Sequence, residues 1–243
     1  MVDDKILAFS HIPKTGGSML FQLLRRQYAP EQVVVRPSDE DFAVRRQAAL
    51  VIPFNLPNKR LMRAHTDWSL QDYIEQPLEL ITMLRHPIDR VVSLYRFVRR
   101  QSAHEQNERA NQMTLREFVE WEYGHHQCQN VMTRWIAGTY NYLPYTPGML
   151  DADLHIAKER LNDIMWFGVL EELDLSLEWL NALTGWPLEN PGKVNYAPDE
   201  ATQLVEDNRG FIYDHNRHDW ELYEYALKLV RENAYAATYV HRE

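Results

Sequence analysis

The feature that most constrains the fold lies near the start of the chain, where an apolar run leads into a turn with two adjacent glycines. The run covers residues 5–12 and ends at Pro13, and Gly16 and Gly17 follow shortly after. A short apolar run bounded by such residues is typical of a buried strand that ends in a turn. Apolar side chains then recur at helical spacing over residues 19–24. The sequence therefore predicts a strand, a glycine turn and a helix.

Further apolar segments extend this pattern. The predicted strands after the first cover residues 60–65, 78–84 and 165–170. Pro87 suits the first position of a helix, and an apolar stripe at helical spacing runs from Ile88 to Val98. A second helical pattern covers residues 173–183. Alternating strands and helices predict an α/β fold with a central, mostly parallel sheet flanked by helices.

The remaining segments carry weaker signals. Residues 101–112 are polar and predict a loop, residues 114–124 look helical, and residues 138–152 read as an irregular excursion. The segment 219–237 is a strong helix with one apolar face. At 243 residues, without internal repeats, the chain fits a single domain spanning residues 1–243.

Composition excludes several classes of protein. The formal net charge of −9 argues against general nucleic-acid binding, which needs a basic face. Cys128 is the sole cysteine, so no internal disulfide can form. No signal peptide precedes the first strand and no apolar stretch reaches membrane-spanning length. We therefore expect a protein without a membrane anchor in the cytoplasm.

The glycine turn has the composition of an anion site. Lys14 supplies a full positive charge, and Thr15 and Ser18 supply hydroxyl groups at the start of a predicted helix. Helix N-termini bind anions through unpaired N–H groups, and glycines let the backbone approach a phosphate closely. The alternative is a plain strand-to-helix turn with a solvated lysine. The turn is not a Walker A loop, because its lysine precedes the glycines.

A second candidate anion site follows the strand at 78–84. Arg85 stands at its carboxyl end and Ser93 lies eight residues further along, inside the next helix. An arginine at a strand end can bind a phosphate with two N–H groups, and a serine can add a hydroxyl. The alternative is that Arg85 pairs with Asp89 while Ser93 only packs. Two such sites at neighbouring strand ends suit a nucleoside with a phosphate at each end.

These motifs resemble those of a known family. Residues 11–18 and 84–95 resemble the two nucleotide-binding segments of sulfotransferases that use 3′-phosphoadenosine 5′-phosphosulfate (PAPS). The likeness is strongest to the branch containing heparan sulfate 2-O-sulfotransferase and its bacterial relatives. Weaker likeness extends over residues 130–138, 167–177 and 193–195.

The resemblance implies a P-loop-like three-layer α/β fold and roles for individual residues. The 5′-phosphosulfate would be held by Lys14, Thr15, Gly16, Gly17 and Ser18. Arg85 and Ser93 would hold the 3′-phosphate, and His65 falls where this branch places its catalytic histidine. Ser18 replaces the threonine that is common in relatives, and both residues supply a hydroxyl.

The resemblance also implies an O-sulfotransferase reaction by in-line displacement, which releases 3′-phosphoadenosine 5′-phosphate (PAP). His65 would act as general base on an acceptor hydroxyl, because imidazole titrates near neutral pH. Lys14 would be the second catalytic residue and neutralise charge on the leaving oxygen. The chemistry requires no metal. Candidate acceptors are saccharides and other small hydroxylated molecules, selected by loops at 36–58, 100–112 and 138–152.

Other interpretations remain open at this stage. A nucleotide kinase would need magnesium and a Walker lysine, and a non-catalytic nucleotide- or glycan-binding protein could share the fold. His65 could instead be a buried structural histidine. Arg45, Arg46, Arg99 and Arg100 could attract an acidic acceptor or form an ordinary solvated face. His125, His126 and Cys128, or His215 and His218, could be drawn as metal sites, but neither group is a complete ligand set.

Overall fold

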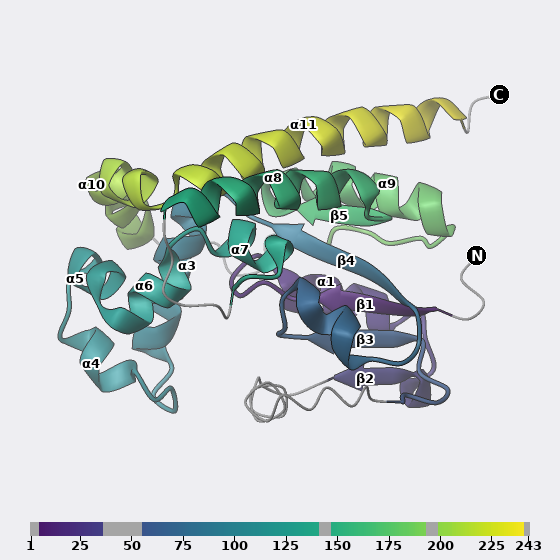
Figure 1. Cartoon of the computed structure of the whole chain (residues 1–243), viewed down its shortest axis with the longest axis horizontal. Helices are drawn as coiled ribbons and strands as arrows, with labels where there is room; N and C mark the ends of the chain where they lie inside the picture. The colour runs from purple at the N-terminus through teal and green to yellow at the C-terminus, as the bar shows by residue number, and fades with distance from the viewer. Residues whose placement is uncertain (1–4, 36–54, 141–146, 193–198, 241–243) are drawn as a thin grey trace.

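The computed structural model describes residues 5–35, 55–140, 147–192 and 199–240, and its centre is a five-stranded sheet (Figure 1). The strand order is β2-β3-β1-β4-β5, and every neighbouring pair is parallel. The strands are β1 (Ile6–Ser10), β2 (Val33–Val35), β3 (Leu61–Ala64), β4 (Leu78–Leu84) and β5 (Trp166–Val169). The predicted α/β class with a parallel sheet is confirmed.

The central position of β1 follows from its composition. All five of its residues are buried, as expected of a strand covered on both faces. It pairs with β3 through Ala8 and Met62 and with β4 through Ala8 and Leu80. The edge strand β2 was not predicted, because three partly exposed valines are too short a run to separate from a loop.

Helices cover the sheet and extend beyond it. The helices of the first half are α1 (Gly17–Arg25), α3 (Pro87–Arg100), α4 (Asn107–Asn111), α5 (Leu115–Glu120) and α6 (Glu122–Cys128). Those of the second half are α7 (Val131–Ala137), α8 (Pro147–Asp163), α9 (Leu173–Thr184), α10 (Asp199–His215) and α11 (Arg217–Val240). Short 3₁₀ turns occur at η1 (Pro30–Gln32), η2 (Trp68–Tyr73) and η3 (Leu170–Glu172). Figure 1 shows α11 running along α8 and α9, with which it packs.

Several predicted segments differ in the structure. The predicted loop at 101–112 contains α4, and the predicted helix at 114–124 is divided at Trp121, whose backbone is extended. Thr114 and Glu117 form a reciprocal capping box that starts α5. Of the predicted irregular segment 138–152, residues 141–146 lie outside the described residues, and residues 147–152 belong to α8, which begins at Pro147. The sequences of α4 and α8 mix polar and apolar residues without a clear helical period, so the pattern did not predict these helices.

The apolar side chains form two clusters. The larger one lies around the sheet, and the smaller one joins α3 to α5, α6 and α10. The predicted stripe from Ile88 to Val98 is buried in the smaller cluster. As a result, α3 connects the end of β4 to a helical region beside the sheet (Figure 1). None of the helices in the described ranges is sufficiently long and apolar to cross a membrane.

Candidate functional site

The predicted site residues follow three adjacent central strands. His65 follows β3, residues 11–16 follow β1, and Arg85 follows β4. The chain adds β2 and β3 on one side of β1 and then β4 and β5 on the other. Open parallel sheets bind ligands beyond the carboxyl ends of their strands at such a switch point. The fold therefore brings the predicted residues to one edge of the sheet.

The loop after β1 has a backbone suited to an anion. Lys14 and Gly16 adopt positive φ angles of 70° and 86°, and Gly16 is the N-cap of α1. Thr15 is fully buried, and its Oγ1 donates a hydrogen bond to the Ile12 carbonyl at 2.9 Å. Ser18 is exposed in the first turn of α1. Left-handed residues before a helix start form a concave group of backbone N–H donors.

The two glycines are required for different reasons. Gly16 has the left-handed backbone that side chains with a Cβ rarely adopt. Gly17 is required by space, because a Cβ there would lie 2.1 Å from Cδ2 of His11 and 2.7 Å from Cζ of Phe9. Glycine at position 17 thus lets the His11 ring pack against the first turn of α1.

Lys14 points its ammonium group toward α3. Its Nζ lies 4.0 Å from the centroid of the Phe97 ring, a cation–π distance. Burial, with a further contribution from Arg85, lowers the pKa of Lys14 from 10.5 to about 8. Lys14 therefore keeps its charge at neutral pH and stands next to α3.

Arg85 joins the two predicted anion sites. Its Nη1 donates a hydrogen bond to the carbonyl of Lys14 at 3.2 Å, and its Nε lies 3.9 Å from Oε1 of Glu171. Asp89, the expected partner in the alternative interpretation, lies 3.6 Å from Nδ1 of His86. The structure thus brings Arg85 and the glycine turn into direct contact.

Ser93 is placed by the geometry of α3. It is half-buried and lies four residues before Phe97, so both residues are on the same face of the helix. Because Phe97 contacts Lys14, this face of α3 is directed toward the glycine turn.

His65 packs against a second histidine. The rings of His65 and His11 have centroids 4.4 Å apart. Burial, followed by the charge of Arg63, lowers the pKa of His65 to about 4, whereas a hydrogen bond to the His11 backbone raises it. Because this hydrogen bond raises the pKa, it stabilises the protonated imidazole, so a ring N–H of His65 is the donor and the His11 backbone is the acceptor. At neutral pH the other ring nitrogen therefore carries a lone pair, as a general base requires.

His11 is a site residue to which the sequence assigned no role. It is 5% exposed, and burial lowers its pKa to about 2, with His65 the next cause. Its Nδ1 is buried and has no hydrogen-bond partner within the described part of the chain. The signal that could have identified it is a histidine at the end of a buried strand, directly before the anion-binding turn.

Comparison with known proteins identifies the family. Residues 1–166 match the model of the sulfotransferase family. The chain belongs to the sulfotransferase family.

Other comparisons add little. No curated protein matches the sequence of this chain. Among solved structures, mouse sulfotransferase SULT7A1 in complex with PAP is similar, with 16% sequence identity and a TM-score of 0.42. The similarity covers 84% of this chain and 63% of the mouse chain, so the chain spans less than two thirds of that protein. The likeness to the heparan sulfate branch stays an expectation.

Two of the histidines considered as metal ligands, His126 and His215, have partners within the chain. The Nδ1 of His126 lies 3.0 Å from Nη2 of Arg134, and the Nδ1 of His215 lies 2.8 Å from the Phe211 carbonyl. Burial raises the pKa of the Cys128 thiol to about 12. Within the described ranges no three histidine, cysteine or acidic residues are grouped as metal ligands. The side chain of His125 lies outside the described residues.

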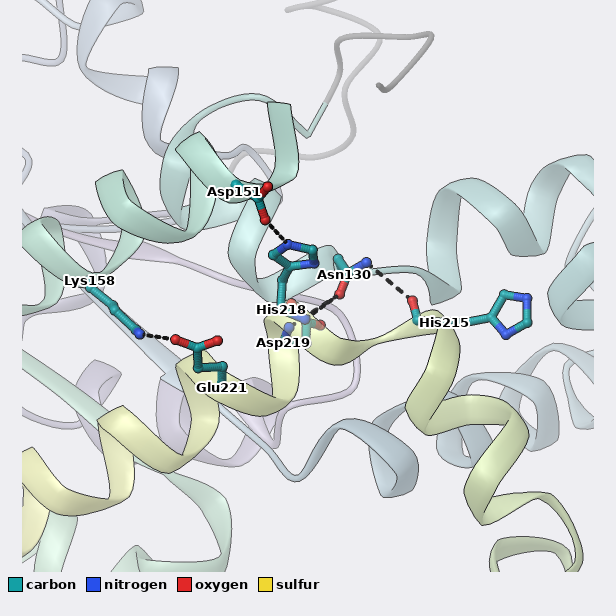
Figure 2. Close-up of polar contacts among 7 residues, drawn as sticks. All are labelled: Asn130, Asp151, Lys158, His215, His218, Asp219 and Glu221. Atoms are coloured by element: carbon teal, nitrogen blue, oxygen red, sulfur yellow. Dashed lines mark hydrogen bonds and ion pairs between the residues drawn. The ribbon is translucent and has the colours of Figure 1, made fainter. Parts of the chain in front are cut away.

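The motif around Asn130 has a structural role, as Figure 2 shows. Asn130 precedes α7 and its Oδ1 accepts hydrogen bonds from the backbone N–H groups of His218 and Asp219. Asp219 in return accepts bonds from the N–H groups of Met132 and Thr133 at 3.1 and 2.7 Å. The starts of α7 and α11 therefore cap each other, and the C-terminal helix is tied to the part of the chain that matches the family.

Proposed function

We propose that this chain transfers a sulfonate from PAPS to the hydroxyl group of an acceptor. The observation that carries the proposal is the hydrogen bond between Arg85 Nη1 and the Lys14 carbonyl, at 3.2 Å. It joins an arginine at one strand end to an anion-binding loop at the next. A donor with one phosphate on each side of a nucleoside suits two linked cationic sites. Membership of the sulfotransferase family supports the same donor.

The residues present fit such a donor. The glycine turn offers backbone N–H groups, the Lys14 ammonium and the exposed Ser18 hydroxyl to the 5′-phosphosulfate. Arg85 and Ser93 are the proposed ligands of the 3′-phosphate. Arg85 is 26% exposed at its side chain, so part of the guanidinium remains accessible to a ligand.

The reaction that we propose is an in-line displacement at sulfur. PAPS, when bound, supplies an electrophilic sulfonate and a nucleotide leaving group. His65 takes the proton of the acceptor hydroxyl while the acceptor oxygen forms a bond to sulfur and the bond from sulfur to the 5′-phosphate oxygen breaks. Lys14 stabilises the negative charge that develops on that leaving oxygen. PAP and a sulfate ester are the products, and the proton remains on His65 for release to water.

The acceptor is proposed as a hydroxylated molecule, with saccharides as candidates. The loops expected to recognise the acceptor lie partly outside the described residues. Arg45 and Arg46 both lie outside them. Arg99 is used within the protein, because its Nε donates to Asn111 and its Nη1 to the Tyr95 hydroxyl. Arg100 is exposed at the end of α3 and stays a candidate contact for an acidic group.

Calorimetry with PAP, AMP, ADP and ATP, each with and without magnesium, tests the proposal. We expect PAP to bind without metal and more tightly than AMP. Arg85→Ala should weaken PAP binding by about tenfold or more, because charge-assisted hydrogen bonds contribute about 1.5–3 kcal/mol. Arg217→Ala is the matched control, since Arg217 pairs with Asp214 at an exposed position. Preference for ATP with magnesium would instead indicate a nucleotide kinase.

Turnover completes the test. PAP release from PAPS should increase when a suitable hydroxylated acceptor is added from a panel of saccharides and phenols. PAP binding with no sulfonate transfer to any member of a broad panel would favour a non-catalytic nucleotide-binding protein.

A further inference from the structure

Glu171 lies beside the proposed 3′-phosphate site and beyond the residues that match the family model. It belongs to η3, directly after β5. Both of its carboxylate oxygens lie 3.1 Å from the backbone N of His86, which donates the hydrogen bond. Its Oε2 also accepts a bond from the Tyr223 hydroxyl at 3.2 Å, and its Oε1 lies 3.9 Å from Nε of Arg85.

These contacts place Glu171 at the corner where β4 turns into α3. His86 is the N-cap residue of α3, so the carboxylate binds a donor at the positive end of that helix. Arg85 donates a hydrogen bond to the Lys14 carbonyl through Nη1, and the Glu171 carboxylate lies 3.9 Å from its Nε, within ion-pair distance but beyond hydrogen-bond distance. The hydrogen bond fixes one edge of the planar guanidinium, and the nearby negative charge of Glu171 favours the orientation in which Nε faces the carboxylate.

The Glu171 carboxylate has one cationic neighbour at the β4–α3 corner. Arg85 is the only cation within 4 Å of the Glu171 carboxylate among the described residues, and Asp89 contributes a second negative charge nearby. The adjacent Glu172 has a different partner, because it pairs with Arg231 on the outer side of α11. Glu171 and Glu172 thus both contact α11, through Tyr223 and Arg231 respectively. Of the two, Glu171 alone also contacts the β4–α3 corner.

We propose that Glu171 is a positioning residue that orients Arg85 and the β4–α3 corner for the 3′-phosphate of the nucleotide. It acts through the His86 N–H and Arg85 without touching the nucleotide itself. Tyr223 holds the carboxylate from α11, so the C-terminal region completes a site whose ligands lie in the first 100 residues. This inference rests on the proposed function, because it assumes that Arg85 binds the 3′-phosphate.

The experiment compares the affinities of PAP and AMP, which differ by the 3′-phosphate alone. The ratio of the AMP and PAP dissociation constants is measured by calorimetry for wild type, Glu171→Ala, Glu171→Asp, Arg85→Ala and the double variant. We expect the ratio to fall about tenfold in Glu171→Ala, the loss typical of a charge-assisted hydrogen bond. Glu171→Asp keeps the charge but loses reach to His86, so the ratio should fall at least about threefold.

The controls separate positioning from general damage. Glu172→Ala should keep the wild-type ratio within about twofold, and thermal unfolding shows whether each variant is folded. If Glu171→Ala is unfolded, the ratio measured for Glu171→Asp decides the result. Adding Glu171→Ala to Arg85→Ala should lower the ratio less than Glu171→Ala lowers it in wild type, because part of the effect of Glu171 passes through Arg85.

Two results would overturn the inference. Equal weakening of PAP and AMP in both Glu171 variants, which leaves the ratio unchanged, would indicate a structural residue, and unchanged affinities for both nucleotides would remove the role altogether. If wild type itself does not prefer PAP to AMP, the donor site of the proposed function fails and this inference fails with it. If wild type prefers PAP to AMP and both Glu171 variants keep that preference in full, the positioning role of Glu171 is contradicted and the proposed function is not.

Discussion

Nη1 of Arg85 donates a hydrogen bond to the carbonyl of Lys14 at 3.2 Å, which joins two loops that are 71 residues apart in the chain. The contact exists because β1 and β4 are neighbours in the parallel sheet, so their carboxyl ends lie side by side. Lys14 has a left-handed backbone at this point, with φ of 70°. A change in either loop is therefore expected to affect the candidate anion site on the other.

The affinity for PAP should fall as the pH rises through about 8. Burial lowers the pKa of Lys14 from 10.5 to about 8, so its ammonium is charged below that pH and neutral above it. A bound anion favours the charged form and raises this pKa, so the loss extends to higher pH in the complex. Calorimetry at constant ionic strength between about pH 6.5 and 9.5 would measure it. Lys14→Met should lack the step, whereas Lys158→Met, on α8, should retain it. The same pH dependence in Lys14→Met would mean that another group titrates.

His65→Ala should reduce turnover by about 10²–10⁴-fold and leave PAP affinity within about threefold of wild type. The reason is that the imidazole removes a proton from the acceptor and is not a proposed ligand of the nucleotide. Steady-state assays and calorimetry on the same preparation would measure both quantities. His155→Ala, at an exposed position of α8, is the control. Loss of PAP binding together with turnover would contradict a role as base and favour a structural one.

Gly17→Ala should destabilise the protein by about 1–3 kcal/mol, the usual cost of inserting a methyl group into a packed region. The new Cβ would lie 2.1 Å from Cδ2 of His11 and 2.7 Å from Cζ of Phe9, and the His11 ring already packs against the rings of Phe9 and His65. Chemical unfolding would measure the change. Gly210→Ala is a matched control in α10, where a Cβ meets no atom within 4 Å. That variant should be as stable as wild type or gain up to about 1 kcal/mol. Equal effects of the two substitutions would show that packing at His11 is not the cause.

Asp219→Ala should destabilise the protein by about 2–4 kcal/mol. Asp219 is fully buried, and its loss would leave the N–H groups of Met132 and Thr133 without acceptors, each at a cost of about 1–3 kcal/mol. The free energy of unfolding in urea would measure the loss. Asp214→Ala removes an exposed carboxylate paired with Arg217 and should cost less than about 1 kcal/mol. Similar values for both variants would mean that the caps of α7 and α11 contribute little.

The fold was predictable where burial is local to a segment. The strand at Leu78–Leu84 and the helix from Pro87 follow from an apolar run, a proline and a helical stripe, and the structure confirms both. The edge strand Val33–Val35 and the helix Val131–Ala137 were missed. The strand is too short to carry a periodic signal. The helix is buried on all sides, so it shows no amphipathic pattern, and Asp219 supplies its N-terminal cap from a distant segment.

The sequence by itself determined the chemical character of the site, because each motif lies on one strand–turn–helix unit. The spacing of Lys14, Gly16 and Gly17 predicts an anion-binding turn, and the backbone at Lys14 and Gly16 has the left-handed conformation that suits one. Only the tertiary structure decided which residues act together: the contact of Arg85 with that turn, the pairing of His65 with His11, and the approach of Glu171 to His86. Each joins different strands of the sheet or their ends. Such contacts depend on the order of parallel strands, which local sequence patterns do not encode.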